Sequence, residues 1–263
     1  MILFKQQFTF FMLCIMSFFL FADQNLMAPN LTQIANEFGF SSLERDTKLG
    51  GEISFVFWML GGFVTLFIGY FTDRVNRIQL LTYIILIGEI PCFLTGFVQS
   101  YQQLFWMRAL TGIGIGGAIP LIYSLLGDLF PPKKRSAAAG TLGLITGLGM
   151  AGGQLLAGAI GPEIGWKIPF IIVAIPNFII VIIFRIFSNE PERGVQDNLS
   201  KLQKSKFSIK EYLSLFKIKT NILIFLQGMF GTVPWSVFFT FLIDYLSQEK
   251  NYSVIDSTFI VSI

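Results

Sequence analysis

Three ionisable side chains lie inside long apolar stretches of the sequence, where charge is rare. Arg108 stands about one helical turn inside the fourth apolar run, Asp23 near the end of the first, and Glu89 near the middle of the third. A charge in the hydrocarbon layer of a membrane costs about 2.5–3.5 kcal/mol on insertion scales, so each group should face a partner or a water-filled cavity. Either acid could pair with Arg108, and such a set of groups can bind, release and respond to a proton.

Each of these groups also has a simpler interpretation. Arg108 could snorkel to the nearer membrane surface, Asp23 could be an ordinary interfacial acid, and Glu89 could be a neutral, hydrogen-bonded structural group. The chain contains no histidine, so any proton transfer near neutral pH falls to carboxylates. We therefore take Asp23, Glu89 and Arg108 as the candidate coupling residues.

Other kinds of chemistry have little support in the sequence. The two cysteines, Cys14 and Cys92, both lie in apolar runs and indicate neither a disulfide framework nor a metal site. We find no nucleophile with a neighbouring base and no phosphate-binding loop, and the GIGIGG stretch lies within an apolar run rather than after a strand. We expect a protein that is not an enzyme, with no cofactor, no metal and no nucleic-acid partner.

The apolar runs have the length of membrane-spanning helices. Of the 263 residues, 53% are hydrophobic and 13% are charged, which is more apolar surface than a soluble domain of this size could bury. Helices of about 20 apolar residues cross a bilayer. We therefore predict an all-α, polytopic protein of the lipid bilayer with spans at residues 8–27, 51–68, 78–98, 104–126, 136–160, 168–187 and 221–246.

The distribution of basic residues predicts the orientation of these spans. Most lysines and arginines fall in the loops on one side, and the other side holds only Arg45, Lys48, Lys167 and Lys250. Positive loops remain in the cytoplasm, so we place the amino terminus there, in a multi-pass protein of the cell (inner or plasma) membrane. A signal peptide in place of the first span is the alternative.

Residues 188–218 form the only long polar segment. Ser208 and Glu211 match a capping box, and the apolar residues beside them have helical spacing, which predicts a short amphipathic helix on the membrane face; a disordered linker is the alternative. We expect an amino-terminal six-helix bundle at residues 1–187, a cytoplasmic linker at 188–218, and the start of a carboxy-terminal bundle at 219–263. The apolar run from residue 253 is too short to cross a bilayer, so we expect a chain truncated after its seventh span.

A short polar turn, GYFTDRVNR, separates the second span from the third. Its pattern resembles the signature G-x-[LF]-x-D-R-x-[GN]-R of the major facilitator superfamily, and RALTGIGIG, which starts at Arg108, resembles the fourth-span motif of the same group. The resemblance implies a fold of two six-helix halves, of which this chain holds the first half, the seventh helix and the start of the eighth. It implies that the turn is a gating motif, with the residues Gly69, Asp73, Arg74 and Arg77, and that Arg108 takes part in proton coupling.

Three further details resemble Spinster-like transporters within that superfamily. They are Ala22 before Asp23, Asn76 within DRVNR, and EPERG just after the sixth span. The resemblance implies a monomeric secondary transporter that moves a small organic or lipid-like solute by alternating access, with protons as the coupling ion. Organic anion or sugar acid transport within the same superfamily is the alternative, as is a non-transporting, truncated membrane protein.

The sequence departs from Spinster-like transporters at two positions. Members often have an arginine after the first-span acid and an acid seven residues after the fourth-span arginine, where this chain has Gln24 and Ile115. We hypothesise that Glu89 substitutes for the second of these groups.

Glycines recur within the fourth and fifth spans. Small residues four apart allow helix backbones to approach closely, so we expect Gly112, Gly116, Gly147 and Gly153 to lie at helix contacts. The pair at residues 161–162 resembles the fifth-span motif of antiporters, although packing alone also accounts for these glycines.

Overall fold

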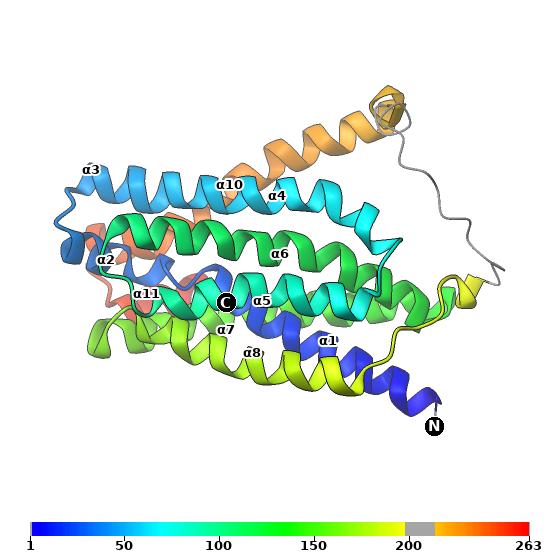
Figure 1. The fold of residues 1–263 in the computed structure, drawn as a ribbon. Coiled ribbons are helices and arrows are strands. Elements are labelled where there is room, and N and C mark those ends of the chain that lie inside the picture. Colours follow the sequence, from blue (N-terminus) through cyan, green and yellow to red (C-terminus); the bar gives the residue numbers. More distant parts are fainter. Residues whose placement is uncertain (1, 198–213, 263) are drawn as a thin grey trace.

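Residues 2–197 and 214–262 are described by a computed structural model, and in those ranges every regular element is helical. Figure 1 shows the long helices running side by side as an elongated bundle. The long helices are α1 (Ile2–Gln24), α4 (Ile53–Thr72), α5 (Arg77–Thr95), α6 (Tyr101–Leu129), α7 (Pro132–Ile164), α8 (Ile168–Phe187) and α10 (Lys219–Glu249). The shorter elements are η1 (Ala28–Asn30), α2 (Leu31–Phe38), α3 (Ser42–Glu44), the π-helix η2 (Arg45–Glu52), η3 (Val195–Asp197), η4 (Leu215–Lys217) and α11 (Val254–Ser262).

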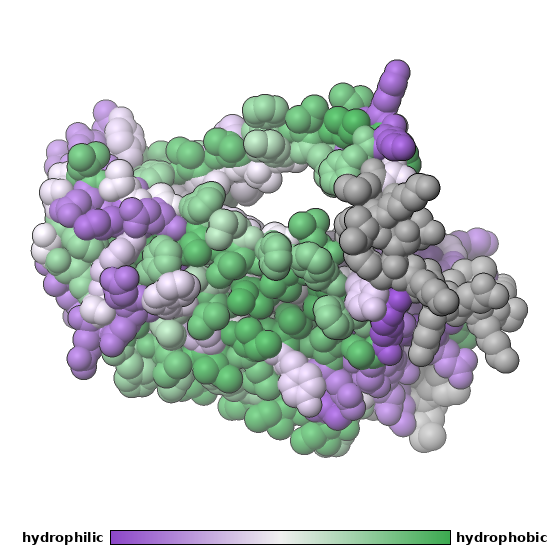
Figure 2. Space-filling view, turned by 45° about the horizontal axis from the view of Figure 1, so that its top comes forward, coloured by the Kyte–Doolittle hydropathy of each residue, from purple (hydrophilic) through white to green (hydrophobic). Residues whose placement is uncertain are grey.

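The seven predicted spans are confirmed. Seven helices of the described residues are long and apolar enough to cross a membrane, and the sixth predicted span coincides with α8. Figure 2 shows a green apolar belt between two purple polar ends, as expected for a surface that faces lipid.

Two predicted turns are shorter than expected. Helix α4 continues to Thr72, and the Asn76 side chain accepts a hydrogen bond from the backbone N–H of Gln79 at 2.9 Å, so the turn covers only residues 73–76. Helix α7 continues through Pro162 into the gap between the fifth and sixth predicted spans, and it ends at Ile164, before Gly165 takes a φ of 110°. The segment between the first two predicted spans is largely helical as well, formed by η1, α2, α3 and η2.

The glycines on α6 bring its backbone against α4. A Cβ at Gly112 would meet the backbone of Phe57, and one at Gly116 would meet the backbone of Gly61. On α7, a Cβ at Gly153 would likewise meet the backbone of Ala22 in α1. These three glycines therefore lie at close helix contacts.

Gly147 makes no close helix contact within the described residues, so its predicted packing role stays a prediction. It is exposed, and no atom of the described residues lies within 4 Å of the position that its Cβ would occupy. Gly149 contacts α1 instead, where a Cβ would meet the backbone of Phe18. Gly149 and Gly153 are four residues apart and so share one face of α7, from which Gly147 is turned away.

The two ends of the bundle differ in how closely α10 packs against them. We call the end formed by α2, α3 and η2 the α2 end, and the end formed by residues 73–76 and the segment after α8 the Arg77 end. Helix α10 lies against the bundle towards the α2 end and diverges from α4 towards the other end (Figure 1). Its buried residues are Ile243 and Asp244, both near the α2 end, and Figure 2 shows a hollow between α10 and the rest of the molecule.

The predicted amphipathic helix begins at Ser208 and lies mostly outside the described residues. The division of the chain at residues 187 and 218 stays a prediction.

Candidate functional site

Arg108 and Asp23 form an ion pair inside the bundle. The Nη1 atom of Arg108, on α6, lies 2.7 Å from Oδ1 of Asp23, on α1, and their side chains are 2% and 1% exposed. The Nη2 atom donates to the backbone carbonyls of Asp23 at 3.2 Å and Gln24 at 3.5 Å. Removing one partner of such a buried pair would leave an uncompensated charge, so the two groups depend on each other.

Aromatic rings enclose the guanidinium of Arg108. The ring centroids of Phe57, on α4, and Phe170, on α8, each lie 5.3 Å from its Cζ atom. Cation–π contacts of this kind are stronger where water is excluded. Four helices therefore position this one cation.

Glu89 does not pair with Arg108. Its fully buried side chain accepts a hydrogen bond from Nδ2 of Asn177, on α8, at 2.5 Å. The other carboxyl oxygen of Glu89, Oδ1 of Asn177 and Oδ2 of Asp23 are buried without a hydrogen-bond partner among the described residues. Sequence reasoning missed Asn177, although an amide in the apolar run of residues 168–187 is a visible signal.

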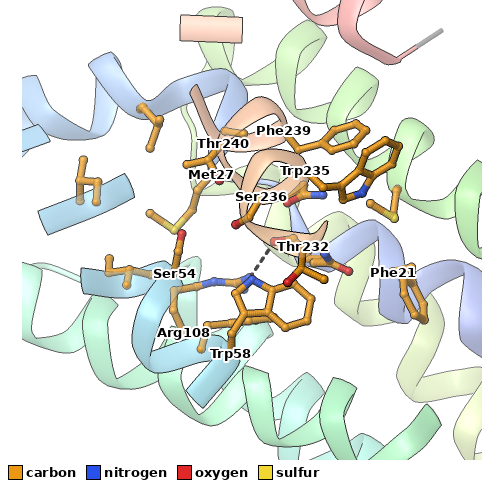
Figure 3. A pocket seen from close by; sticks show the side chains of 18 of the residues that line it. Phe21, Met27, Ser54, Trp58, Arg108, Thr232, Trp235, Ser236, Phe239 and Thr240 are labelled. Atoms are coloured by element: carbon orange, nitrogen blue, oxygen red, sulfur yellow. Dashed lines mark hydrogen bonds between the residues drawn. The ribbon is translucent and has the colours of Figure 1, made fainter. Parts of the chain in front are cut away.

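A cavity of about 550 Å³ lies between α10 and the part of the bundle that holds Arg108. Figure 3 shows Arg108 and Trp58 on the bundle side, facing Thr232 and Ser236 of α10. Arg108 is the one charged residue among the described residues that line it. The wall also includes the aromatic residues Phe21, Phe57, Trp58, Trp235 and Phe239, and the polar residues Gln24, Asn25, Ser54, Thr232, Ser236 and Thr240.

A second buried arginine, Arg77, joins three segments at the Arg77 end. Its side chain is 3% exposed and lies 2.5 Å from the carboxylate of Asp128, on α6, and 3.0 Å from that of Glu190, which follows α8. It also donates to the carbonyl and hydroxyl of Ser124 and to the carbonyl of Pro191. The partners of Arg77 could not be read from the turn motif, because they lie more than forty residues away in sequence.

The other residues of the predicted gating motif lie outside this network. Asp73 is exposed, and within the described ranges its side chain makes no hydrogen bond or ion pair with Arg77 or another residue. Arg74 stacks on the ring of Tyr70, with 3.6 Å between Cζ and the ring centroid, and Gly69 is exposed in the last turn of α4. In this structure the carboxylates of Asp128 and Glu190, rather than Asp73, hold Arg77.

An ion pair joins α10 to the bundle at the α2 end. Nη1 of Arg45, on η2, lies 2.9 Å from Oδ2 of Asp244, whose Oδ1 accepts a hydrogen bond from Thr32 at 2.6 Å. No pattern in the sequence links residues this far apart, so the contact was not predicted. Among the described residues, no group of acids and cysteines could hold a metal ion.

Two relatives with curated names match much of the chain. A protein of Haemophilus influenzae named for metabolite transport is 28% identical over 238 residues, which are 84% of this chain and 56% of that protein. The cis,cis-muconate transport protein of Acinetobacter baylyi is 28% identical over 197 residues, which are 75% of this chain and 46% of that protein. The chain spans about half the length of the curated relatives it matches.

A solved structure has the same fold. It is that of a bacterial homologue of the human lysosomal transporter Spinster in an inward-facing, unoccupied conformation, with a TM-score of 0.80 at 21% identity, covering 97% of this chain and 58% of that one. This likeness confirms the predicted fold class. The family model of the Major Facilitator Superfamily matches residues 13–263. The chain is therefore a multi-pass membrane protein of a transporter family rather than an enzyme, and it belongs to the Major Facilitator Superfamily.

Proposed function

We propose that the protein is a secondary active transporter that moves a small organic or lipid-like solute by alternating access, coupled to protons. The observation that carries the proposal is the Asp23–Arg108 ion pair, buried at the wall of a cavity that has room for such a solute. A proton on Asp23 would neutralise its carboxylate and weaken its hold on Arg108. Proton binding would thereby change the charge that the cavity presents.

Glu89 has a supporting role in this proposal. It lies on α5, which packs closely against α6 at Gly88 and Gly114. One of its carboxyl oxygens has no partner among the described residues, so we propose that it holds a proton near the pair. We expect Glu89→Gln to slow solute-driven proton uptake by about tenfold or more, the size of effect typical of a positioned proton-transfer group. Asn177→Asp, which places a second acid beside Glu89, should change the pH dependence of uptake as well. An unchanged proton flux in Glu89→Gln would remove Glu89 from the pathway.

The arrangement of α10 supports an inward-open state. The Arg45–Asp244 pair closes the α2 end, whereas α10 diverges from α4 towards the Arg77 end (Figure 1). We propose that the Arg77 end lies in the cytoplasm with the amino terminus, and the bias of lysine and arginine towards the loops at this end supports this orientation. We propose a monomer in the cell membrane with a six-helix bundle at residues 1–187, a linker at 188–218, and a second bundle that begins at 219.

The Arg45–Asp244 pair should then restrain opening to the outside. Asp244→Asn removes the ion pair, and we expect a cysteine placed at Ser54 in the cavity to react about fivefold or more faster with an impermeant maleimide added outside. The native Cys14 and Cys92 are buried and give a low background. Asp256→Asn is the matched control, because Asp256 is exposed and bonds to the nearby Ser253. Equal labelling in both variants would show that Arg45–Asp244 is no gate.

Transport itself is tested with the protein expressed from its complete reading frame and reconstituted into liposomes that contain a pH-sensitive dye. The added solutes are cis,cis-muconate, gluconate and lysophosphatidylcholine, one for each candidate class. We expect at least one to drive proton movement in the wild type, and Arg108→Ala to reduce it by about a hundredfold. The control is Arg185→Gln, because Arg185 is exposed. Full flux in a folded Arg108→Ala variant would contradict the proposal.

A further inference from the structure

We propose that the cavity binds an organic anion with a flat apolar body, and that its anionic group takes Arg108 in place of Asp23. The proposal rests on the transport function above and names the class of solute for the same site. Three features of the described residues support it: the sign of the charge in the cavity wall, the unused donors of Arg108, and the aromatic side chains around it.

The cavity wall offers positive charge and no negative charge among the described residues. Arg108 lines it, whereas Asp23 lies behind Arg108 and contributes no side chain to the wall. A cationic solute would therefore meet an arginine with no acid to balance it. An anion would meet its complement at a guanidinium whose side chain is only 2% exposed, where such attraction is stronger than in open water.

Arg108 retains hydrogen-bonding capacity for a second acceptor. A guanidinium has five N–H donors, and the structure uses one short bond to the Asp23 carboxylate and two longer ones, at 3.2 and 3.5 Å, to backbone carbonyls. Its Nε–H has no acceptor among the described residues. Arginine binds carboxylates and phosphates with two parallel N–H bonds, so an entering anion could make a better pair than these backbone carbonyls.

The remaining wall fits an apolar ring system with polar substituents. Trp58 lines the cavity on the same side as Arg108, and Trp235 and Phe239 line it from α10 (Figure 3). Thr232, Ser236 and Thr240 recur every four residues along α10 and so place three hydroxyls on one face. Aromatic side chains favour flat apolar groups, and the hydroxyls can orient polar substituents on them.

Competition for Arg108 would couple the anion to a proton. When the anion binds Arg108, the Asp23 carboxylate loses its counter-ion and becomes stable in its buried position only once it takes up a proton. One anion and one proton would then enter together, with no net charge moved. The charged and titratable groups near Asp23 are Arg108 on α6 and Glu89 and Cys92 on α5, and α8 contributes the neutral Asn177 and Phe170.

The test measures binding of three probes that share one ring system. Naphthoate, naphthamide and naphthylmethylammonium are titrated by calorimetry into the detergent-solubilised protein from its complete reading frame, over the pH range in which naphthoate stays ionised. We expect naphthoate to bind about tenfold or more tightly than the amide, and the cation to bind weakest. Naphthoate affinity should rise as the pH falls, because protonation of Asp23 frees Arg108, and binding in weak buffer should take up about one proton.

Asp23→Asn separates competition from simple charge attraction. This variant keeps Arg108 and removes its competitor, so naphthoate should bind more tightly than to the wild type and with no pH dependence. Asp256→Asn is the matched control, because Asp256 is exposed and lies outside the cavity wall, and it should keep the pH dependence. Equal affinity for acid and amide in the wild type, or an unchanged pH dependence in Asp23→Asn, would overturn the proposal.

These experiments distinguish failure of the proposed anion site from failure of the proposed transport function. Wild-type protein that moves protons with a neutral solute and shows no preference for naphthoate would retain the proposed transport function and exclude the anion site. Protein that prefers naphthoate yet moves no solute in liposomes would retain the anion site and exclude transport. The comparison of naphthoate with naphthamide uses the wild-type protein alone, so it tests the anion site even if Asp23→Asn folds poorly.

Discussion

Alanine at Gly112 or Gly116 is expected to lower the melting temperature sharply and to reduce the yield of monodisperse protein. The added Cβ at Gly112 would overlap the backbone of Phe57, and that at Gly116 the backbone of Gly61. A backbone cannot move aside as the end of a flexible side chain can, so α4 and α6 would have to separate along their shared contact. We expect a cost of about 3 kcal/mol or more, at the upper end of what overpacking causes.

Gly147→Ala is the matched control for these substitutions. Gly147 lies in the middle of α7, is exposed, and has open space at its Cβ position within the described part of the chain. Alanine there should stabilise the helix by about 0.5–1 kcal/mol, because glycine is the poorer helix former. Melting curves in one detergent compare all three variants. If Gly112→Ala and Gly116→Ala melt at the same temperature as Gly147→Ala, the close contact of α4 and α6 is wrong.

Replacing Arg77 with glutamine should be the most destabilising change at the Arg77 end. The variant leaves the carboxylates of Asp128 and Glu190 without their shared cation, and it removes bonds to Ser124 and Pro191. Breaking a buried ion pair by removing one partner costs about 3–5 kcal/mol. The segment after α8 should also loosen, which limited proteolysis near residue 190 would detect.

Arg74→Gln serves as the control, because Arg74 lies in the turn just before α5 and is partly exposed. It stacks on Tyr70, and loss of a partly exposed cation–π contact costs about 0.5–1 kcal/mol. A second comparison neutralises the partners: adding Asp128→Asn and Glu190→Gln to Arg77→Gln should recover part of the lost stability. Equal melting temperatures for Arg77→Gln and Arg74→Gln would contradict the network around Arg77.

The positions of the spans could be predicted from hydropathy, because a membrane requires long uninterrupted apolar helices. Arg108 could be identified for the same reason, since an arginine in such a helix needs a specific environment. The choice between Asp23 and Glu89 as its partner could not be made from the sequence. It depends on how α1, α5 and α6 are rotated against one another, and several rotations satisfy the same apolar pattern.

Contacts between distant segments were beyond the reach of sequence reasoning. Arg45 and Asp244 are polar residues near helix ends, where charge is common and signals nothing by itself. The glycines of α7 show the same limit at shorter range: spacing alone made Gly147 and Gly153 equivalent, but only the face with Gly149 and Gly153 meets α1. Which of several small-residue rows becomes the contact is decided by the neighbouring helix.

The most direct test of coupling by the Asp23–Arg108 pair measures proton movement and solute movement together in liposomes. It compares the wild type with Asp23→Asn. A trapped dye reports internal pH while a radiolabelled solute reports exchange, with the solute taken from those that drive flux in the wild type. We predict that Asp23→Asn still exchanges solute between the two sides but moves no protons with it. If Asp23→Asn moved as many protons per molecule of solute as the wild type does, this result would contradict coupling through the pair.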